Sequence, residues 1–215
     1  MPMSRRVVTR ARSSTPKPYI PARFAHRMLP ATQHATAAFK TDKPNVPMTT
    51  RFILRGRAEN DSAALFAMFL QPLCRRGAFR EFISAEDLEA WFHSQGTGNV
   101  ELVVAANDTA IALGGLFFGT GCQAHVGTVC LFVHDDYHRL GIGRRLMSAI
   151  VTAADRTAHL RRMQLFVSCD NTNAIALYRR FGFSVEGRHE CSIQRGDRYV
   201  DVYTMAKTRK DAEQM

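Results

Sequence analysis

Two glycines stand at the start of an expected helix, within the stretch HDDYHRLGIGRRLMSAI (residues 134–150). From Ile142 onward, apolar residues recur with helical spacing, so one face of this helix is expected to pack on other elements. The first turn of a helix presents unpaired N–H groups and a partial positive charge, and glycines such as Gly141 and Gly143 let a ligand approach them. Further positive charge comes from Arg139, Arg144 and Arg145. The spacing therefore predicts a site for a phosphate or pyrophosphate group.

Two common nucleotide-binding loops do not fit this stretch. The chain contains no G-x-x-x-x-G-K-[ST] sequence, which a P-loop requires. A dinucleotide-binding fingerprint needs a third small residue, and Leu146 stands at that place. The segments before the loop also have the pattern of antiparallel hairpins. Both nucleotide interpretations are therefore disfavoured.

Two motifs together resemble the GCN5-related N-acetyltransferase (GNAT) family. The acetyl-coenzyme A loop of that family, [Q/R]-x-x-G-x-[G/A], corresponds to His138, Arg139, Leu140, Gly141, Ile142 and Gly143, with His138 in place of Gln or Arg. The family pattern N-x-x-A-x-x-[L/V]-Y-x-x-x-G-F is matched by Asn171, Ala174, Leu177, Tyr178, Gly182 and Phe183. The resemblance covers residues 51–206. The ending RGDRYVDVYTMA is similar to the bacterial branch that acetylates free amino acids or similar small amines.

The resemblance implies that acetyl-coenzyme A is the cosubstrate and that its pantetheine arm lies between two splayed strands. Backbone contacts are then expected from Phe132 and Val133, and a side-chain contact from Asn171. The backbone N–H of Val133 is also expected to stabilise the oxyanion. The pyrophosphate is expected to be held by the loop residues and the arginine that follows them, namely His138, Arg139, Leu140, Gly141, Ile142, Gly143 and Arg144.

Tyr178 matches the tyrosine that lies beside the thioester sulfur in the family. A phenol with an ordinary pKa of about 10 is close enough to a thiol at about 8.5 to donate a hydrogen bond or a proton to the departing thiolate. The alternative is a core tyrosine, because Ala174, Leu177 and Phe181 lie on the same helical stripe. The motif favours a catalytic or sulfur-contacting role.

The sequence leaves the proton acceptor and the substrate contacts open. An amine is mostly protonated near neutral pH, so a carboxylate, a histidine or a water chain must take its proton. The candidates for this base are Glu101, His125, His134 and Asp170. A cluster that could bind a substrate carboxylate, or simply form an exposed basic loop, consists of Arg75, Arg76 and Arg80. Asp135 and Asp136 are expected to be surface charges.

The helices and strands predicted from the sequence follow the order β, α, α, β, β, β, α, β, α, β, β. The first helix is expected to begin at Asn60 or Asp61 and to end at Pro72, and the second to be capped by Ser84. Hairpins are expected across Asn107-Asp108 and across QRGD. This order predicts an α/β (α+β) fold, and the resemblance implies a mostly antiparallel sheet of about seven strands with about four helices.

Residues 1–48 differ in composition from the rest of the chain. They hold nine basic residues and one acidic residue, so this segment carries +8 of the net charge of +10. They are also rich in proline and lack apolar periodicity, which predicts a disordered tail before a single domain at 49–215. The tail is interpreted as a transit-like segment, as a nucleic-acid or membrane tether, or as an overlong start before Met48.

Cysteine spacing and hydropathy indicate whether the protein binds a metal, forms disulfides or spans a membrane. The five cysteines are scattered without metal-site spacing, which predicts no metal and a reducing compartment. The longest apolar run, 110–119, is shorter than the roughly 18 residues that span a bilayer, so a cytoplasmic protein without a membrane partner is expected.

The leading functional hypothesis is acetyl transfer from acetyl-coenzyme A to the primary amine of a small molecule, such as a free amino acid. A protein or peptide acceptor is one alternative. A non-catalytic acyl-coenzyme A-binding module, tethered to nucleic acid by the basic tail, is another. Nucleic-acid binding is disfavoured because a few interspersed arginines are weak evidence for it. A homodimer remains open.

Overall fold

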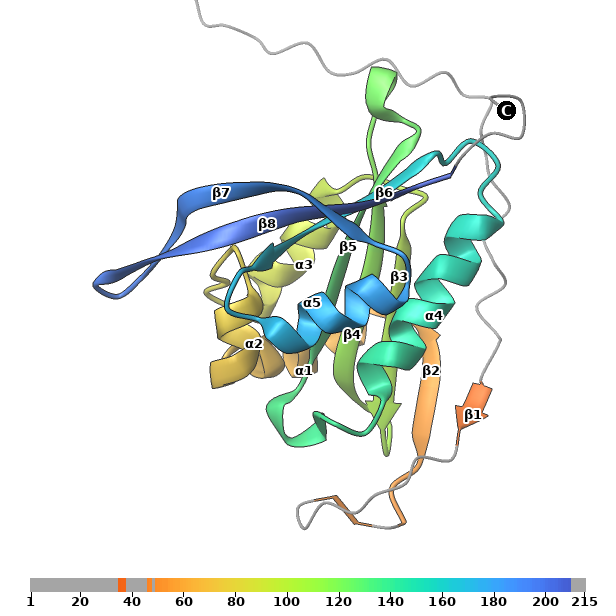
Figure 1. Ribbon diagram of the computed structural model, residues 1–215. Helices are drawn as coiled ribbons and strands as arrows, with labels where there is room; N and C mark the ends of the chain where they lie inside the picture. The colour runs from red at the N-terminus through yellow and green to blue at the C-terminus, as the bar shows by residue number, and fades with distance from the viewer. Residues whose placement is uncertain (1–34, 38–45, 48, 210–215) are drawn as a thin grey trace, which may run out of the picture.

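The computed structural model describes residues 35–37, 46, 47 and 49–209, which form one sheet with helices on both faces (Figure 1). The strand order is β1-β2-β3-β4-β5-β6-β8-β7. The strands are β1 (Ala35–Ala37), β2 (Phe52–Gly56), β3 (Val100–Ala106), β4 (Thr109–Phe118), β5 (Val126–Val133), β6 (Arg162–Ser168), β7 (Ser184–Arg195) and β8 (Arg198–Thr208). The α-helices are α1 (Ser62–Phe69), α2 (Pro72–Gly77), α3 (Ala85–Ser94), α4 (Ile142–Asp155) and α5 (Thr172–Arg180).

The predicted fold class is confirmed. Strands β2 to β8 form the expected seven, and every neighbouring pair is antiparallel except β5 with β6, which is parallel. Helices α1, α3, α4 and α5 are the expected four, each eight residues or longer. The structure adds the three-residue strand β1 and the six-residue helix α2 to this expectation.

Helices α4 and α5 cover one face of the sheet, and α1, α2 and α3 cover the other (Figure 1). The predicted apolar stripe of α4 is buried, with Ile142, Leu146 and Ile150 each at most 1% exposed. Gly114 in β4 allows this close approach, because a Cβ there would lie 3.0 Å from Ile150 Cδ1. Glycine in the strand thus lets the helix that carries the glycine loop pack tightly on the sheet.

Two local predictions are confirmed by backbone geometry. The hydroxyl of Ser84 accepts a hydrogen bond from the backbone N–H of Asp87 at 3.1 Å and caps α3. Asn107 and Asp108 both have positive φ, at 47° and 69°, as the tight turn between β3 and β4 requires.

The prediction that Pro72 ends the first helix is wrong. Helix α1 ends at Phe69, and Pro72 is instead the first residue of α2, where its missing N–H costs no helical hydrogen bond. Asp61 precedes α1 as expected, but its carboxylate does not cap that helix. It accepts two hydrogen bonds from Arg55 at 2.7 Å and one from the N–H of Ala58 at 2.8 Å.

Part of the N-terminal segment is described by the structure. Strand β1 lies within the segment expected to be a tail, and it pairs with β2 of the domain. Val46, in the same segment, is only 3% exposed in a cluster with Phe52. The rest of the expected tail lies outside the described residues. Within the described ranges, no helix combines the length and hydropathy needed to cross a bilayer.

Candidate active site

Strands β5 and β6 separate where the family resemblance predicts a gap. In the part of the chain that the structure describes, they pair only over Val126–Thr128 and Arg162–Gln164, after which β5 remains paired with β4 and β6 with β8. The N–H of His134 donates to Ile111 O at 2.8 Å. In the register of β4 with β5, this bond places every second residue, namely His134, Phe132 and Cys130, in a hydrogen-bonded position opposite β4. Because the ladder alternates, the backbone N–H and C=O of Val133 and of residues 131 and 129 point toward the gap.

The end of β5 is tied to both neighbouring segments. The carbonyl of Val133 accepts hydrogen bonds from His138 Nε2 at 2.8 Å and from Cys74 Sγ at 2.9 Å. The side chain of His138 therefore folds back onto the strand and braces the loop that follows it. Burial, together with the nearby Asp135 carboxylate, raises the pKa of the Cys74 thiol to about 12, so this group stays a protonated donor near neutral pH.

The prediction that Asp135 is a surface charge is wrong. Its carboxylate accepts hydrogen bonds from the backbone N–H groups of Leu73 at 2.9 Å and Cys74 at 3.2 Å. These two N–H groups belong to the first turn of α2, so Asp135 caps that helix from a distant loop. The contact joins α2 to the start of the loop between β5 and α4.

The glycine loop has the backbone geometry that a bound anion requires. Gly141 is the N-cap of α4 with φ 78°, and a Cβ added there would meet no atom within 4 Å. The first helical hydrogen bond runs from Arg145 N to Gly141 O at 3.1 Å, so the N–H groups of residues 142–144 have no partner within the helix. Gly143 faces inward instead, because its Cβ would lie 3.4 Å from Leu131 Cδ2.

The predicted loop residues divide into two groups. The side chains of Leu140 and Ile142 pack in the core with Val104 and Ala112, so only their backbone can reach a ligand. The side chain of Arg139, in the loop, and that of Arg144, in the first turn of α4, are exposed. Arg139 also has a positive φ of 69°, a conformation that non-glycine residues rarely adopt.

Tyr178 lies on α5, over the gap, and Asn171 is the residue directly before this helix. Tyr178 is 6% exposed in a cluster that also contains Val129 of β5 and Leu165 of β6. Burial, followed by the nearby Cys130 thiol, raises the pKa of the Tyr178 phenol well above its usual range near 10. Asn171 caps α5, since its Oδ1 accepts a hydrogen bond from Ala174 N at 3.2 Å. The structure therefore places a buried, protonated phenol beside the middle of β5.

Among the four candidates for the base, Glu101 and Asp170 are held by arginines. Glu101 accepts from Arg57 Nε at 2.7 Å, whereas Asp170 lies 3.0 Å from Arg76 and 3.2 Å from Arg195. Burial tends to raise the pKa of Asp170, but these two arginines lower it below its usual value, which makes it a weaker base.

The two histidines lie at opposite ends of β5. His125 is exposed before the strand, where its carbonyl accepts from the N–H of residues 161 and 162. His134 directly follows the strand, beside Val133, and its ring packs against Tyr137 at 5.6 Å between centroids. The four candidates therefore do not converge on one point, and His134 is the one at the glycine-loop end of the gap.

Arg57 is the centre of a half-buried ion-pair network that is expected to stabilise the fold. Its side chain is 8% exposed, pairs with Glu89 at 2.8 Å and with Glu101, and stacks on Phe92 at 3.9 Å. We expect Arg57→Met to lower the free energy of unfolding by about 3 kcal/mol, because it leaves two poorly solvated carboxylates without their cation. Urea denaturation measures this change, with the exposed Arg51→Met as control. Equal stability of the two variants would contradict the expectation.

An open pocket of about 380 Å³ lies between the segment that begins at Pro72 and the tip of the β7–β8 hairpin. The predicted arginine cluster lines it, which brings Arg75, Arg76 and Arg80 together as expected. Each already has an acidic partner, in the pairs Arg75–Glu81 at 2.8 Å, Arg76–Asp170 at 3.0 Å and Arg80–Asp87 at 2.8 Å. These pairs are largely exposed, so each is weak and can exchange partners.

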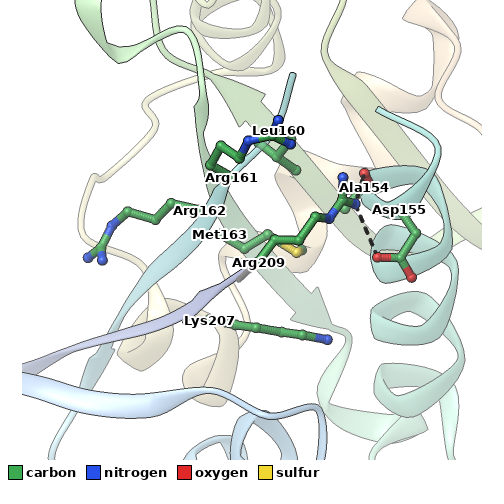
Figure 2. Close-up of a pocket in the computed structure, with 8 residues that line it drawn as sticks. All are labelled: Ala154, Asp155, Leu160, Arg161, Arg162, Met163, Lys207 and Arg209. Atoms are coloured by element: carbon green, nitrogen blue, oxygen red, sulfur yellow. Dashed lines mark hydrogen bonds and ion pairs between the residues drawn. The ribbon is translucent and has the colours of Figure 1, made fainter. Parts of the chain in front are cut away.

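A smaller pocket of about 80 Å³ lies where β6 begins and α4 ends (Figure 2). Figure 2 shows Arg209 reaching across it, where its guanidinium donates to Ala154 O at 3.0 Å and pairs with Asp155 at 3.3 Å. These bonds satisfy carbonyls at the C-terminal end of α4. The pocket is therefore part of the helix cap, and it lies at the opposite end of α4 from the glycine loop.

One group of possible metal ligands occurs among the residues that the structure describes, namely Glu59, Glu89 and His93. Glu89 already pairs with the Arg57 guanidinium and accepts from the Ser62 hydroxyl, and these bonds compete with a cation. The expectation that the protein uses no metal stays a prediction.

Three residues of the site region carry no sequence signal that we could interpret. Cys130 lies beside Tyr178, whereas Ser168 and Arg195 form a contact near the larger pocket. Each acts through partners distant in sequence, and none belongs to a motif. The sequence indicates only that Arg195 belongs to the predicted turn QRGD.

With this geometry, the comparisons with known proteins establish the family. The profile of the acetyltransferase (GNAT) family matches residues 65–183, more than half of the chain. The match includes the glycine loop, the separated strands and α5. The chain belongs to the acetyltransferase (GNAT) family.

Two relatives with assigned activities are similar to parts of this chain. The L-amino acid N-acetyltransferase AaaT of Escherichia coli (strain K12) is 30% identical over 87 residues, which are 40% of this chain and 54% of that protein. The chain thus matches about half the length of that relative. An L-methionine sulfoximine/L-methionine sulfone acetyltransferase of Pseudomonas paraeruginosa is 28% identical over 121 residues, or 54% of this chain and 70% of that protein.

A solved structure has the same fold. The putative acetyltransferase yncA of Salmonella typhimurium, with its cofactor acetyl-CoA, superposes with a TM-score of 0.66 at 18% identity. The superposition covers 75% of this chain and 96% of that protein. At this identity the likeness concerns the fold.

Proposed function

We propose that this protein transfers the acetyl group of acetyl-coenzyme A to the primary amine of a small molecule, with free amino acids as the favoured class. The observation that carries the proposal is the buried phenol of Tyr178 over the gap between β5 and β6, with the open glycine loop at the end of β5. Membership of the acetyltransferase (GNAT) family supports it. The amino-acid acetyltransferases among its relatives support the substrate class.

The residues on both sides of the gap fit acetyl-coenzyme A. Open space beside Gly141 leaves the first N–H groups of α4 accessible to the pyrophosphate, and Arg139 and Arg144 add positive charge there. The backbone N–H of Val133 and the backbone groups of Leu131, together with the amide nitrogen of Asn171, would hold the pantetheine arm, whereas the backbone groups of Phe132 face β4 and are not available for it. Acetyl-coenzyme A supplies a thioester that is activated toward amines.

The chain itself would supply the proton transfers and the electrostatic stabilisation. The N–H of Val133 points toward the gap and would donate to the acetyl carbonyl oxygen as negative charge develops there. Tyr178 Oη would donate a hydrogen bond or its proton to the departing thiolate. Its raised pKa keeps the phenol protonated, and because it also makes the phenol a weaker acid, it favours the hydrogen bond. Water beside His134 would accept the proton of the amine, since Nδ1 of His134 already accepts a hydrogen bond from the N–H of Asp136 at 3.3 Å.

The pocket of about 380 Å³ would receive the acceptor. Arg75, Arg76 and Arg80 surround it with positive charge, and a carboxylate can take the place of one of their exposed acidic partners. A free amino acid presents both the amine to be acetylated and a carboxylate for an arginine. Polyamines and aminoglycosides lack that carboxylate and would be repelled.

The substrate class can be tested with matched pairs of acceptors. The full chain is incubated with acetyl-coenzyme A and a panel of L-amino acids, their carboxamides, polyamines, aminoglycosides and short peptides, and products are identified by mass spectrometry. We expect acetylated free amino acids and much slower reaction of each matching carboxamide. Acetylation of peptides alone would favour a protein acceptor. Tight acetyl-coenzyme A binding without any product would favour a non-catalytic binding module.

We propose that the protein acts in the cytoplasm on a small-molecule partner without a metal, and that residues 49–215 hold its single acetyltransferase domain, with which β1 pairs and against which Val46 packs. A homodimer and the role of residues 1–48 are left to direct measurement of mass and of truncated chains.

A further inference from the structure

The β7–β8 hairpin extends beyond the rest of the sheet (Figure 1). Strand β8 pairs with β6 only over residues 202–208, so nearer the tip β7 and β8 form a two-stranded ribbon. Most side chains of β7 are exposed. A two-stranded ribbon is marginally stable by itself, so additional contacts must fix where this hairpin lies.

A bulge sets the course of the hairpin. The pairing of β7 with β8 shifts register between His189 and Ile193, and Cys191 within this stretch has a φ of 51°. The carboxylate of Asp201 on β8 holds the bulge, since it accepts from the N–H of Cys191 at 2.8 Å and from Arg188 Nε at 2.8 Å. Such a bulge bends a strand and increases its twist.

Arg195 fixes the tip beyond this bulge. Its guanidinium donates to the hydroxyl of Ser168 at 2.6 Å and to Asp170 at 3.2 Å, at the end of β6. It also donates to the carbonyl of Arg76 in α2. The side chain of Arg195 is only 16% exposed, and Ser168 is 3% exposed, although the turn that follows is exposed. One side chain therefore joins the hairpin tip to two elements distant in sequence.

These contacts close one side of the proposed acceptor pocket. One wall consists of residues 72–81, and the other of residues 193–196 at the hairpin tip. Arg195 links the walls through its bond to Arg76. We propose that Arg195 is a positioning residue for acceptor binding: its bonds to Ser168, Asp170 and Arg76 hold the hairpin tip in place as the second wall of the pocket. The acceptor part of this inference rests on the proposed function.

Arginine suits this task better than lysine. Its planar guanidinium donates to the Ser168 hydroxyl, the Asp170 carboxylate and the Arg76 carbonyl from two separate nitrogens in fixed directions, whereas the three donors of an ammonium group all lie on one atom. Removing it leaves the hairpin dependent on its own ribbon hydrogen bonds. The tip should then move, and the pocket should lose its defined shape.

The test compares Arg195→Ala and Arg195→Lys with Arg198→Ala. Arg198 pairs with Arg195 in register across the same turn and is exposed, so its replacement changes the charge equally without touching Ser168. Hydrogen–deuterium exchange of residues 189–200 reports the mobility of the tip and needs no enzyme activity. Steady-state kinetics of the full chain report KM for the acceptor and for acetyl-coenzyme A separately.

For Arg195→Ala we expect exchange at the tip to become about tenfold faster, since local opening loses its restraint. We expect the acceptor KM to rise about tenfold, because misplacing a wall weakens substrate positioning, with the KM for acetyl-coenzyme A unchanged. Arg195→Lys should fall between the wild type and Arg195→Ala, and Arg198→Ala should match the wild type.

Unchanged exchange in Arg195→Ala would overturn the inference, whatever the kinetics. So would equal increases in both KM values, or the same defects in Arg198→Ala. Faster exchange in a protein that acetylates no amine would support the role of Arg195 at the hairpin and contradict the proposed function instead. The two failures are therefore distinguishable.

Discussion

We expect Tyr178→Phe to lower kcat by about a hundredfold or more, the loss that follows when a positioned hydrogen-bond or proton donor is removed. The affinity for acetyl-coenzyme A is expected to stay nearly unchanged, because the ring keeps its packing in the cluster with Ile175 and Phe183. Thiol release measures kcat, and equilibrium titration measures the affinity. Burial, with the nearby Cys130 thiol, raises the pKa of Tyr178, so its ionisation should not reduce the wild-type rate up to about pH 10.

Tyr203→Phe is the matched control for this prediction. Tyr203, on β8, packs against the same hydrophobic cluster but is not part of the family motif. It should retain wild-type kcat. Full activity of Tyr178→Phe, or an equal loss in both variants, would assign Tyr178 to the core alone.

The second large effect is expected at the glycine loop. Gly141→Val should weaken acetyl-coenzyme A binding by about a hundredfold, since hydrogen bonds to charged groups contribute about 1.5–3 kcal/mol each. The new side chain would fill the open space through which the pyrophosphate reaches the first turn of α4. Its positive φ of 78° also strains any side chain placed there. Isothermal titration with acetyl-coenzyme A measures the loss, and thermal unfolding tests whether the fold remains.

Gly96→Val separates these two causes. Gly96 has a φ of 81° and likewise no atom within 4 Å of an added Cβ, but it lies between α3 and β3. The backbone strain is thus similar, and acetyl-coenzyme A binding should be retained. If both variants bound acetyl-coenzyme A equally well, Gly141 would not lie on the path to the pyrophosphate.

Features encoded by neighbouring residues could be predicted from the sequence. The stripe of α4, the cap at Ser84 and the turn at Asn107-Asp108 each depend on residue types a few positions apart. The same local logic located Gly141 at the start of a helix. The separation of β5 and β6 came from the family resemblance, because no local pattern states where two distant strands stop pairing.

Long-range partners were the part that the sequence could not supply. Asp135 lies in a polar stretch that is typical of an exposed turn. Its carboxylate nevertheless caps α2, which lies about sixty residues away in the chain. Glu101 has a carboxylate that could act as a catalytic base, but this carboxylate forms an ion pair with Arg57. In each case the fold of the sheet determines which distant residue becomes the partner. The spacing of residues along the chain does not predict that pairing.

The central claim is that the chain moves an acetyl group from acetyl-coenzyme A to a free amino acid. The most direct test is the initial rate of thiol release from acetyl-coenzyme A by the full chain, with and without a mixture of L-amino acids, for the wild type and Tyr178→Phe. We expect release that depends on the amino acids and on Tyr178. Release that needs neither, or no release from a protein that binds acetyl-coenzyme A, would contradict it.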